Sequence, residues 1–367
     1  MHPTHHRTTP SILSLVFLLI SISQGLSFAF ASSPLSSTSS SSLPKRSSTK
    51  LHADVLSLES IRSTLIRQEE TIIFALIERS QFSYNAPIYS SSSPLSQNSL
   101  PLGARVPEDV ESLLPLSFLE YMLLGTELLH GSVRRYTSPD EHSFFPTLIP
   151  EPLSTLKPLT YPPELLSPVG NANLVNFNSV LLKRYINEVI PLITLPGDDD
   201  QYGSSVLTDT LILQSLSKRI HYGKFVAESK YLSDPEGYQR LCGEGDVEGV
   251  MRLLTNEIVE EKVLKRSKIK AATYGREPLS DAIPVGKERS KDSEIRDIVA
   301  AAAAAAANAA VDIMGDGYAG MKLKPSVVEG LYRDLIIPLT KEIEVEYLFR
   351  RTGFECPDRK KEIWGLK

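Results

Sequence analysis

Cysteine is almost missing from this chain of 367 residues, in which only Cys242 and Cys356 occur. Two cysteines so far apart do not make a disulfide framework or a zinc site, and we interpret them as ordinary thiols of a reducing compartment. An excess of positive charge is also missing, because the formal net charge is −5. This balance argues against non-specific binding of nucleic acid by the chain as a whole.

Acidic residues are absent from the first 53 positions. Arg7 precedes an apolar run, Ile12–Ile22, which is too short to span a bilayer and is typical of a signal-peptide core. The small residues Ser27 and Ala29 then give the small-x-small pattern of a cleavage site. We therefore predict a signal peptide over residues 1–29.

The next stretch, residues 30–53, is rich in serine, free of acidic residues and basic through Lys45, Arg46 and Lys50. Transit peptides have this composition. A signal core followed by Phe30 and such a stretch resembles the two-part address of plastids that lie inside extra membranes, which predicts import into the plastid (chloroplast) stroma. The alternative is the secretory route, by secretion or retention, or a membrane anchor. Once the leader is removed, we expect no association with membranes.

Apolar residues recur at intervals of three and four over most of the remaining chain, and no alternating strand pattern of useful length occurs. We predict an all-α fold with a single domain over residues 54–356 and a C-terminal tail over 357–367. The stretches 80–101, 138–168 and 197–203 read as loops. The expected helices are 55–77, 116–136, 174–190 with its end near Pro191, 207–232, 246–274, and 325–351 with a bend at Pro338.

One segment, residues 276–321, differs from its surroundings. It is charged and then contains the alanine run Ala300–Ala307. Alanine favours helix but offers little volume to a core, so we interpret this segment as a surface insertion.

Polar residues occur in pairs on helices that are otherwise strongly apolar. Two of the pairs are one turn apart, and the third spans eleven residues, which returns to nearly the same helix face about 16 Å along the axis. Such pairs either line a polar cavity between packed helices or lie on solvated faces. The pairs are Arg219 with Lys230, Asn256 with Glu260, and Thr340 with Glu344.

Five long blocks, in the right order, resemble the fungal and plant chorismate mutases of the all-helical eukaryotic type (type II). The likeness runs from about residue 55 to residue 351, except for the insertion, and it implies a multi-helix bundle that forms a homodimer with one active site per subunit. It also implies the rearrangement of chorismate to prephenate in phenylalanine and tyrosine biosynthesis. The blocks are 61–80, 134–146, 215–230, 246–262 and 337–351.

The resemblance places seven active-site residues. Their implied roles are Arg62 and Arg219 on the two substrate carboxylates, Lys230 and Glu344 at the ether oxygen, Asn256 assisting a carboxylate, Glu260 at the ring hydroxyl, and Thr340 beside Glu344. Lys270 falls where the family has a supporting lysine. The implied [3,3] shift needs no nucleophile, metal or redox cofactor, so no cofactor and no metal are expected.

These residue types suit that chemistry. A guanidinium grips a carboxylate through a planar fork, and a donor at the ether oxygen stabilises the charge that grows there in the transition state. Lys230 donates in its ordinary charged form, whereas Glu344 donates only when it is protonated. We therefore expect burial to raise the pKa of Glu344.

Family members bind aromatic amino acids at the dimer interface, and the matching positions here are Arg134 and Arg135, with Gly203 and Ser204 on the loop before the next helix. Two cations suit a carboxylate, and a Gly-Ser turn offers backbone donors. Without the resemblance, the two arginines would read as a solvated pair. Two departures from the fungal pattern, Leu207 and Lys324, leave the sign and strength of control by Tyr, Phe and Trp open.

Two other functions compete with this interpretation. One is a catalytically silent homologue that only senses amino acids or binds a partner; all seven site positions keep the expected residue, which argues against it. The other is a nucleic-acid binder that uses the basic run from Lys262 to Lys270. Glu257, Glu260 and Glu261 flank that run, so a charged helix face is the better interpretation and no nucleic-acid partner is expected.

Overall fold

The computed structural model describes residues 56–93, 95, 116–157, 165–274 and 323–357, all of which belong to one compact unit, Ser47–Lys367. The predicted signal peptide (1–29), the transit-like stretch (30–53), the start of the domain at residue 54, the insertion (276–321) and residues 358–367 of the tail lie outside the described residues. These assignments stay predictions.

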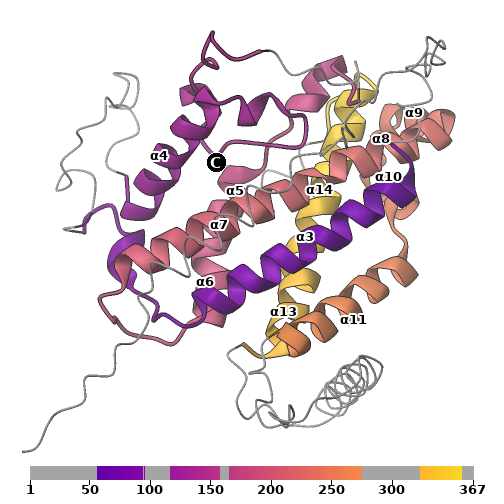
Figure 1. Cartoon of the computed structure of the whole chain (residues 1–367). Coiled ribbons are helices and arrows are strands. Elements are labelled where there is room, and N and C mark those ends of the chain that lie inside the picture. The colour runs from indigo at the N-terminus through magenta and orange to yellow at the C-terminus, as the bar shows by residue number, and fades with distance from the viewer. Residues whose placement is uncertain (1–55, 94, 96–115, 158–164, 275–322, 358–367) are drawn as a thin grey trace, which may run out of the picture. The chain divides into compact units, whose positions relative to one another are not determined.

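The predicted all-α class is confirmed: every element of the described residues is helical, and only an isolated bridge pairs Ser83 with Leu195 (Figure 1). The α-helices are α3 (Leu58–Arg79), α4 (Phe118–Ser132), α5 (Asn178–Arg184), α6 (Ile190–Ile193), α7 (Tyr202–His221), α8 (Gly223–Ser233), α9 (Pro235–Gly243), α10 (Val247–Leu254), α11 (Glu257–Tyr274), α13 (Pro325–Leu331) and α14 (Ile337–Arg351). Short 3-10 turns are η1 (Ala86–Tyr89), η4 (Arg135–Thr137), η5 (Pro146–Leu148) and η6 (Val169–Leu174), and π-helical turns are η7 (Tyr185–Val189) and η9 (Tyr332–Ile336).

Helix α3 forms as its apolar spacing predicts and packs along α7 (Figure 1). Its N-cap is Ser57, whose side chain accepts a hydrogen bond from the backbone N–H of Ser60 at 3.3 Å. The buried stripe of α3, including Ile72 and Leu76, joins the same core cluster as Leu216 of α7. This packing fixes the long axis against which the other helices are placed.

Two helices run through a proline at which a helix would ordinarily stop. The helix that we predicted to end near Pro191 ends at Ile193, two residues beyond the proline. A π turn precedes Pro191, and another precedes Pro338. The residue after each turn donates its N–H to the carbonyl five residues back, from Ile190 to Tyr185 and from Ile337 to Tyr332. The wider turn relieves the clash between the proline ring and the preceding carbonyl.

Two long helices that we predicted are each divided. The expected helix 207–232 begins earlier and is divided at Tyr222 into α7 and α8. The expected helix 246–274 is divided into α10 and α11. At the second break the side chain of Asn256 accepts a hydrogen bond from the N–H of Val259 at 3.1 Å, so Asn256 starts α11 rather than continuing α10. Asparagine favours such positions because its side chain replaces a backbone acceptor.

The observed helices differ from the predicted ones in three smaller respects. Helix α9 was not predicted, although Asp234 caps it by accepting from the N–H of Gly237 at 3.0 Å and Pro235 follows as its first residue. The helix expected from residue 174 starts only at Asn178, after the 3-10 turn η6. Helix α4 ends at Ser132 rather than near residue 136.

Helix α14 packs against α7, α8, α9, α10 and η6 and is therefore covered by other elements on several sides. Ile343, Val345 and Phe349 are fully buried on it. The turn η6 approaches the end of α14 closely, and this approach requires glycine at position 170. Gly170 has φ +56°, and a Cβ on it would stand 2.6 Å from the carbonyl oxygen of Arg350. Among the charged residues of α14, Glu344 is the buried one.

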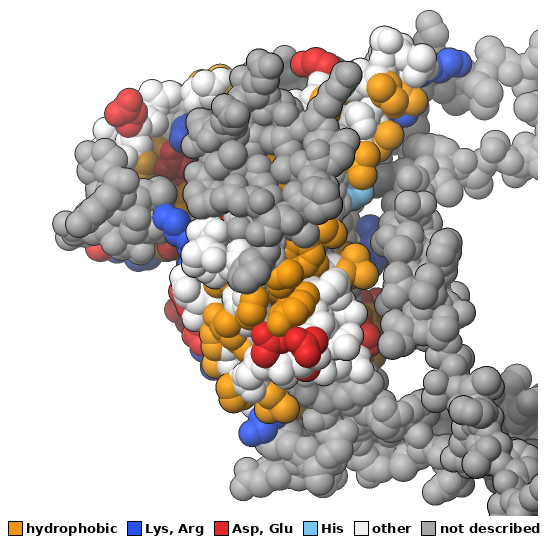
Figure 2. Space-filling model, turned by 90° about the vertical axis from the view of Figure 1, so that its left-hand side faces the viewer, with side chains coloured by type: hydrophobic (Ala, Val, Ile, Leu, Met, Phe, Trp, Pro, Cys, Tyr) orange, Lys and Arg blue, Asp and Glu red, His pale blue; other side chains and the backbone are white. Residues whose placement is uncertain are grey.

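Apolar side chains are also exposed on α4 and on the first half of α7. Leu129 is 72% exposed and Val133 55% on α4, and Leu207 is 46% exposed and Leu211 38% on α7. Figure 2 faces the side of the molecule on which these two segments lie in Figure 1, and it shows hydrophobic side chains gathered there. Among the described residues, none of the helices combines the length and the apolar character that crossing a bilayer requires.

Candidate active site

Four of the seven predicted site residues lie on three helices that pack against one another, α7, α8 and α14. Arg219 is near the end of α7, Lys230 is on α8, and Thr340 and Glu344 are one turn apart on α14. Arg219, Thr340 and Glu344 are buried, and the side chain of Lys230 is 24% exposed. The fold therefore brings together residues that stand more than one hundred positions apart in the sequence.

Glu344 is a buried carboxyl surrounded by cations. Burial raises its pKa to about 7, although the positive charges of Lys230, Arg219 and Lys341 act in the opposite direction. The negative charge of Glu260 adds to the upward shift. Because this pKa lies near neutrality, a large share of the Glu344 side chains carries a proton at pH 7 and can donate a hydrogen bond.

Arg219 is a buried guanidinium whose Nε and Nη1 have no hydrogen-bond partner among the described residues. Burial lowers its pKa, and the charges of Tyr332, Glu69 and Glu344 act in the opposite direction. A guanidinium nevertheless stays protonated, and a buried cation with unused donors is costly unless an acceptor reaches it. This geometry is suited to an anionic group that enters the site.

Lys230 reaches across the site from α8. Its ammonium donates to the carbonyl oxygen of Leu254, the last residue of α10, and its Nζ lies 3.8 Å from Oε2 of Glu344. The carboxyl end of a helix attracts a cation, so α10 helps to hold this ammonium in place. An ammonium and a carboxyl group thus converge on one position from two helices.

Glu260, on α11, is tied to the site by a lysine that the sequence analysis missed. Lys341 lies next to Thr340 on α14, and its Nζ is 2.7 Å from one oxygen of Glu260 and 2.9 Å from the other. The hydroxyl of Thr340 donates to the carbonyl oxygen of Ile336 at 2.6 Å, so it is used within its own helix. Lys341 thereby links α11 to α14.

Two predicted residues are not joined to this group. Arg62, on α3, is exposed and makes no hydrogen bond or ion pair within the described residues. Asn256 is exposed and caps α11 as described above. No contact connects either side chain to Arg219, Lys230 or Glu344, so their roles stay predictions.

A second buried carboxylate, Glu69 of α3, was also missed. It is fully buried and accepts from the Nε of Arg266 at 2.7 Å, and the Nζ of Lys270 lies 3.3 Å from it. Lys270 also donates to the carbonyl of Ile66 at 2.9 Å, so the predicted supporting lysine joins α11 to α3. The sequence held a signal for Glu69, because it interrupts the apolar stripe of α3 on its buried face.

Gly223, the first residue of α8, allows α8 and α14 to approach each other closely. A Cβ at this position would stand 2.9 Å from Cγ2 of Thr340 and 3.2 Å from Cγ of Glu344. The first separation is shorter than real Cβ contacts allow and the second is tighter than most of them, so a larger residue would force its neighbours on α14 to shift. Gly223 is therefore part of the wall of the site, and nothing in its sequence context predicts this.

The predicted effector residues do not form one pocket within a single chain. The guanidinium of Arg135 already has three partners. Its Nε donates to Glu141 at 3.2 Å, and its Nη1 donates to Gln214 at 3.0 Å and lies 2.6 Å from Nδ1 of His130. Arg134 has φ +73°, and its Nε is buried without a hydrogen-bond partner among the described residues.

Gly203 and Ser204 lie in the first turn of α7 rather than in a loop. Gln214, which contacts Arg135, is ten residues beyond Ser204, a distance of about 15 Å along the helix axis. An arginine side chain cannot bridge that distance together with a small ligand. Within one chain, Arg135 and Ser204 therefore contribute to different places on the surface.

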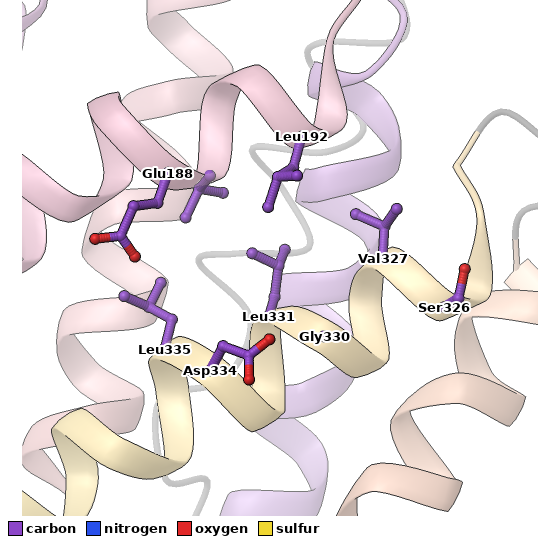
Figure 3. A pocket seen from close by; sticks show the side chains of 9 residues that line it. Glu188, Leu192, Ser326, Val327, Gly330, Leu331, Asp334 and Leu335 are labelled. Atoms are coloured by element: carbon purple, nitrogen blue, oxygen red, sulfur yellow. The ribbon is translucent and has the colours of Figure 1, made fainter.

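A groove of about 290 Å³ lies elsewhere, between η7 and α6 on one side and α13 and η9 on the other (Figure 3). Its walls are apolar, with Leu192 and Leu331 among the lining residues, and it carries the carboxylates of Glu188 and Asp334. It contains none of the predicted site residues. Among the described residues, no group of three or more His, Cys, Asp or Glu is arranged to hold a metal ion.

A guanidinium with unused donors, an ammonium and a carboxyl of raised pKa, all held between helices, define the class: an all-helical enzyme whose site accepts a small anionic molecule. Comparison with known families agrees with this class. The family described as chorismate mutase type II matches residues 203–345, which include Arg219, Lys230, Glu260, Thr340 and Glu344.

Relatives and solved structures extend the match over most of the chain. A protein of Petunia hybrida named chorismate mutase 1, chloroplastic, is 40% identical over 296 residues, which cover 80% of this chain and 75% of the relative. The crystal structure of the chorismate mutase from Candida albicans in complex with L-Trp has 34% identity and a TM-score of 0.63, covering 85% of this chain and 97% of that one. The structure of AtCM1 with tyrosine bound in its allosteric site has 37% identity and a TM-score of 0.60, with coverage of 82% and 98%. This chain belongs to the chorismate mutase family, a family of isomerases of the all-helical eukaryotic type.

Proposed function

We propose that this protein catalyses the [3,3] rearrangement of chorismate to prephenate, and that Arg219, Lys230 and Glu344 carry the reaction. The observation that supports the proposal best is the buried guanidinium of Arg219, which has two unused donors beside the pair formed by Lys230 and Glu344. Chorismate is a dianion, and a carboxylate that reaches this guanidinium would accept a charge-assisted hydrogen bond from one of its unused donors.

The proposed mechanism rests on binding that is stronger in the transition state. Arg219, with Arg62 as the second carboxylate ligand, holds the substrate in a compact, chair-like geometry, and fixing this conformer supplies part of the rate gain. As the carbon–oxygen bond lengthens, negative charge grows on the ether oxygen. The ammonium of Lys230 and the protonated carboxyl of Glu344 donate to that oxygen from two helices.

The remaining residues complete the site in this proposal. Glu260, held by Lys341, accepts from the ring hydroxyl of the substrate, and Asn256 assists a carboxylate. Thr340 lies against Gly223, as Glu344 does, and maintains the spacing of α8 and α14. No step of this reaction transfers a proton to or from substrate carbon, so no general base is assigned.

The experiment is the loss of chorismate absorbance with the purified full chain. Arg219→Ala is expected to lower kcat/KM by at least a hundredfold, because the variant loses the buried cation and its charge-assisted hydrogen bonds to a substrate carboxylate. The matched control is Arg240→Ala, an exposed arginine paired with Glu244 on the surface of α9. A chain that folds and produces no prephenate would instead support the alternative, a catalytically silent homologue that senses amino acids.

We further propose that aromatic amino acids control the enzyme at an interface between two copies of the chain. Arg135 and Ser204 are separated along α7 within one chain, so a pocket that uses both needs Arg134 and Arg135 from one protomer and Gly203 and Ser204 from its partner. The exposed apolar residues of α4 and α7 lie on this same side and suit a homodimer contact (Figure 2). The structures of similar proteins carry Trp in one case and Tyr in another.

The effector proposal is tested by the rate with added Trp and then with added Tyr. We expect Trp, Tyr or both to change the rate, and no response to either amino acid would overturn the effector proposal. Arg134→Ala should abolish the response without changing the basal rate. Sedimentation of wild type and of Leu211→Asp checks the dimer, since a charge at a buried interface should shift the protein to monomers.

We propose a plastid (chloroplast stroma) location, reached through the signal peptide of residues 1–29 and the transit-like stretch of residues 30–53. The Petunia relative is named chloroplastic, while a relative from Zea mays is named cytosolic, so the leader composition is what supports this choice. A fluorescent protein fused to residues 1–53 should enter the plastid, and one fused to residues 1–29 alone should follow the secretory route. Secretion of both fusions would overturn the proposal.

A further inference from the structure

The two cysteines, which stand far apart in the sequence, lie in the same part of the fold. Cys242 is on the last turn of α9 and is 2% exposed, and Cys356 follows the end of α14. Cys356 packs against the core cluster that contains Cys242. Both residues carry thiols in the structure.

The chain reverses direction after α14 and returns along α9. Gly353, at φ +83°, donates to the carbonyl of Arg350 at 3.0 Å, and Phe354 donates to the carbonyl of Phe349 at 3.0 Å, which is the pairing of a Schellman cap. The segment Phe354–Pro357 is then seated on the end of α9. This reversal brings Cys356 back toward the helix that carries Cys242.

Two contacts on either side of Cys356 fix the position of this segment. The ring of Phe354 comes within 3.3 Å of the place a Cβ on Gly243 would occupy, and Cγ of Pro357 comes within 3.5 Å of the same place on Gly245. Gly243 directly follows Cys242 in the chain. Side chains on either side of Cys356 therefore pack against the chain that directly follows Cys242.

The thiol of Cys242 faces the returning segment. Burial raises its pKa to about 11, a hydrogen bond with the side chain of Thr352 acts in the opposite direction, and the neighbouring Cys356 adds to the upward shift. The raised pKa makes Cys242 a weak nucleophile, whereas Cys356 is partly exposed and accessible to a reagent. Cys356 is therefore the thiol that reacts first, and Cys242 is the thiol that resolves the mixed disulfide.

We propose that Cys242 and Cys356 form a reversible intramolecular disulfide when the chain meets a disulfide oxidant of the glutathione type. The thiolate of Cys356 attacks one sulfur of oxidised glutathione, which forms a mixed disulfide and releases one glutathione thiolate. The sulfur of Cys242 then attacks the sulfur of Cys356, which breaks the mixed disulfide and releases the second glutathione. Two protein thiols are oxidised, one glutathione disulfide is reduced, and the two protons pass to the released thiolates.

The bond would fasten the C-terminal segment to α9 beside the candidate active site. Tyr238, one turn before Cys242, is buried, and its pKa is raised by burial and by the charge of Glu344. The disulfide closes a long loop that includes α10, α11 and α14, and long loops give a cross-link its largest effect on the unfolded chain. Oxidation should therefore raise Tm by about 5 °C.

The test is the intact mass of the full chain after equilibration with oxidised glutathione. We expect a loss of about 2 Da, the mass of the two thiol hydrogens, that dithiothreitol reverses. A non-reduced tryptic digest should contain the peptides Leu241–Arg252 and Thr352–Arg359 joined to each other. In Cys242→Ser and in Cys356→Ser the joined peptides and the rise in Tm should both disappear.

Three results would overturn the inference: separate glutathione adducts on both cysteines, a link between two chains, or no reaction at Cys356. Cys356→Ser keeps the buried thiol in place, so this variant stays informative if Cys242→Ser folds poorly. The readouts are mass and Tm, and they do not depend on the proposed mutase reaction.

Discussion

The Nζ of Lys230 lies 3.8 Å from Oε2 of Glu344, and these two side chains reach that separation from different helices, α8 and α14. The ammonium is partly exposed, whereas the carboxyl is buried. Burial raises the pKa of Glu344 to about 7 even though Lys230 opposes the shift. An ammonium and a protonated carboxyl beside each other can donate hydrogen bonds from two directions to an oxygen on which negative charge develops.

The raised pKa of Glu344 predicts the pH dependence of the rate. An acid with a pKa of about 7 is protonated below that pH and loses its donor above it, so kcat should fall as the pH rises through about 7. Glu344→Gln keeps a donor at all pH values and should flatten the profile. If the profile of Glu344→Gln still falls near pH 7, another group is responsible.

Removing the ammonium of Lys230 should affect the chemical step. Lys230→Ala is expected to lower kcat by about 10²- to 10³-fold, as the loss of one oxyanion donor does in other enzymes. Lys262→Ala, at an exposed lysine of α11, is the matched control and should leave kcat unchanged. A loss that appears only in KM would mean that Lys230 binds substrate and transition state equally.

The close approach of α8 to α14 predicts a large effect of adding one methyl group. Gly223→Ala places a carbon 2.9 Å from Thr340 and 3.2 Å from Glu344, so the helices must separate and the distance from Lys230 to Glu344 must change. We expect kcat to fall by at least tenfold and the protein to be destabilised by about 1–3 kcal/mol.

Gly125, on α4, provides the control for this substitution. A Cβ there meets nothing within 4 Å, so Gly125→Ala should leave kcat unchanged and should stabilise α4 by up to about 1 kcal/mol. Urea denaturation and steady-state kinetics on the two variants measure both effects. Equal behaviour of Gly125→Ala and Gly223→Ala would show that the spacing of α8 and α14 does not control the site.

A buried ion pair away from the site should govern stability. The Nε of Arg79 lies 2.7 Å from Asp209, both side chains are fully buried, and Tyr89 and Tyr185 also donate to that carboxylate. Asp209→Ala leaves the guanidinium without its counter-charge and should cost about 3–5 kcal/mol in the free energy of unfolding.

The exposed pair of Arg184 with Glu188 is the comparison for Asp209. Its atoms also approach to 2.7 Å, but the side chain of Glu188 is 48% exposed. Glu188→Ala should therefore cost less than about 1 kcal/mol. Similar losses in the two variants would mean that burial does not set the cost of breaking these pairs.

Apolar spacing predicted the helices that later proved to be α3, α4 and α14, because a helix that buries one face must repeat its apolar residues every three to four positions. The identity of the site residues was also readable, since Arg219, Lys230 and Glu344 match positions of a known family. Both kinds of information are local: each depends on a short window of the chain.

Local windows did not predict the breaks and turns within helices. Tyr222 divides α7 from α8, although the residues around it do not require a break. The π turn before Pro191 lets that helix continue to Ile193. In each case neighbouring helices decide whether a helix bends, stops or continues, and packing outweighs intrinsic preference.

The chemistry of the site depended on the tertiary structure most of all. Groups from α7, α8, α11 and α14 together set three properties of the site. These are the pKa of Glu344, the unused donors of Arg219 and the ion pair of Lys341 with Glu260. Burial and Coulomb interaction depend on distance in space, and the amino-acid order does not contain that distance. The order of residues thus determined which groups the protein has, and the packing of its helices decided what state those groups are in.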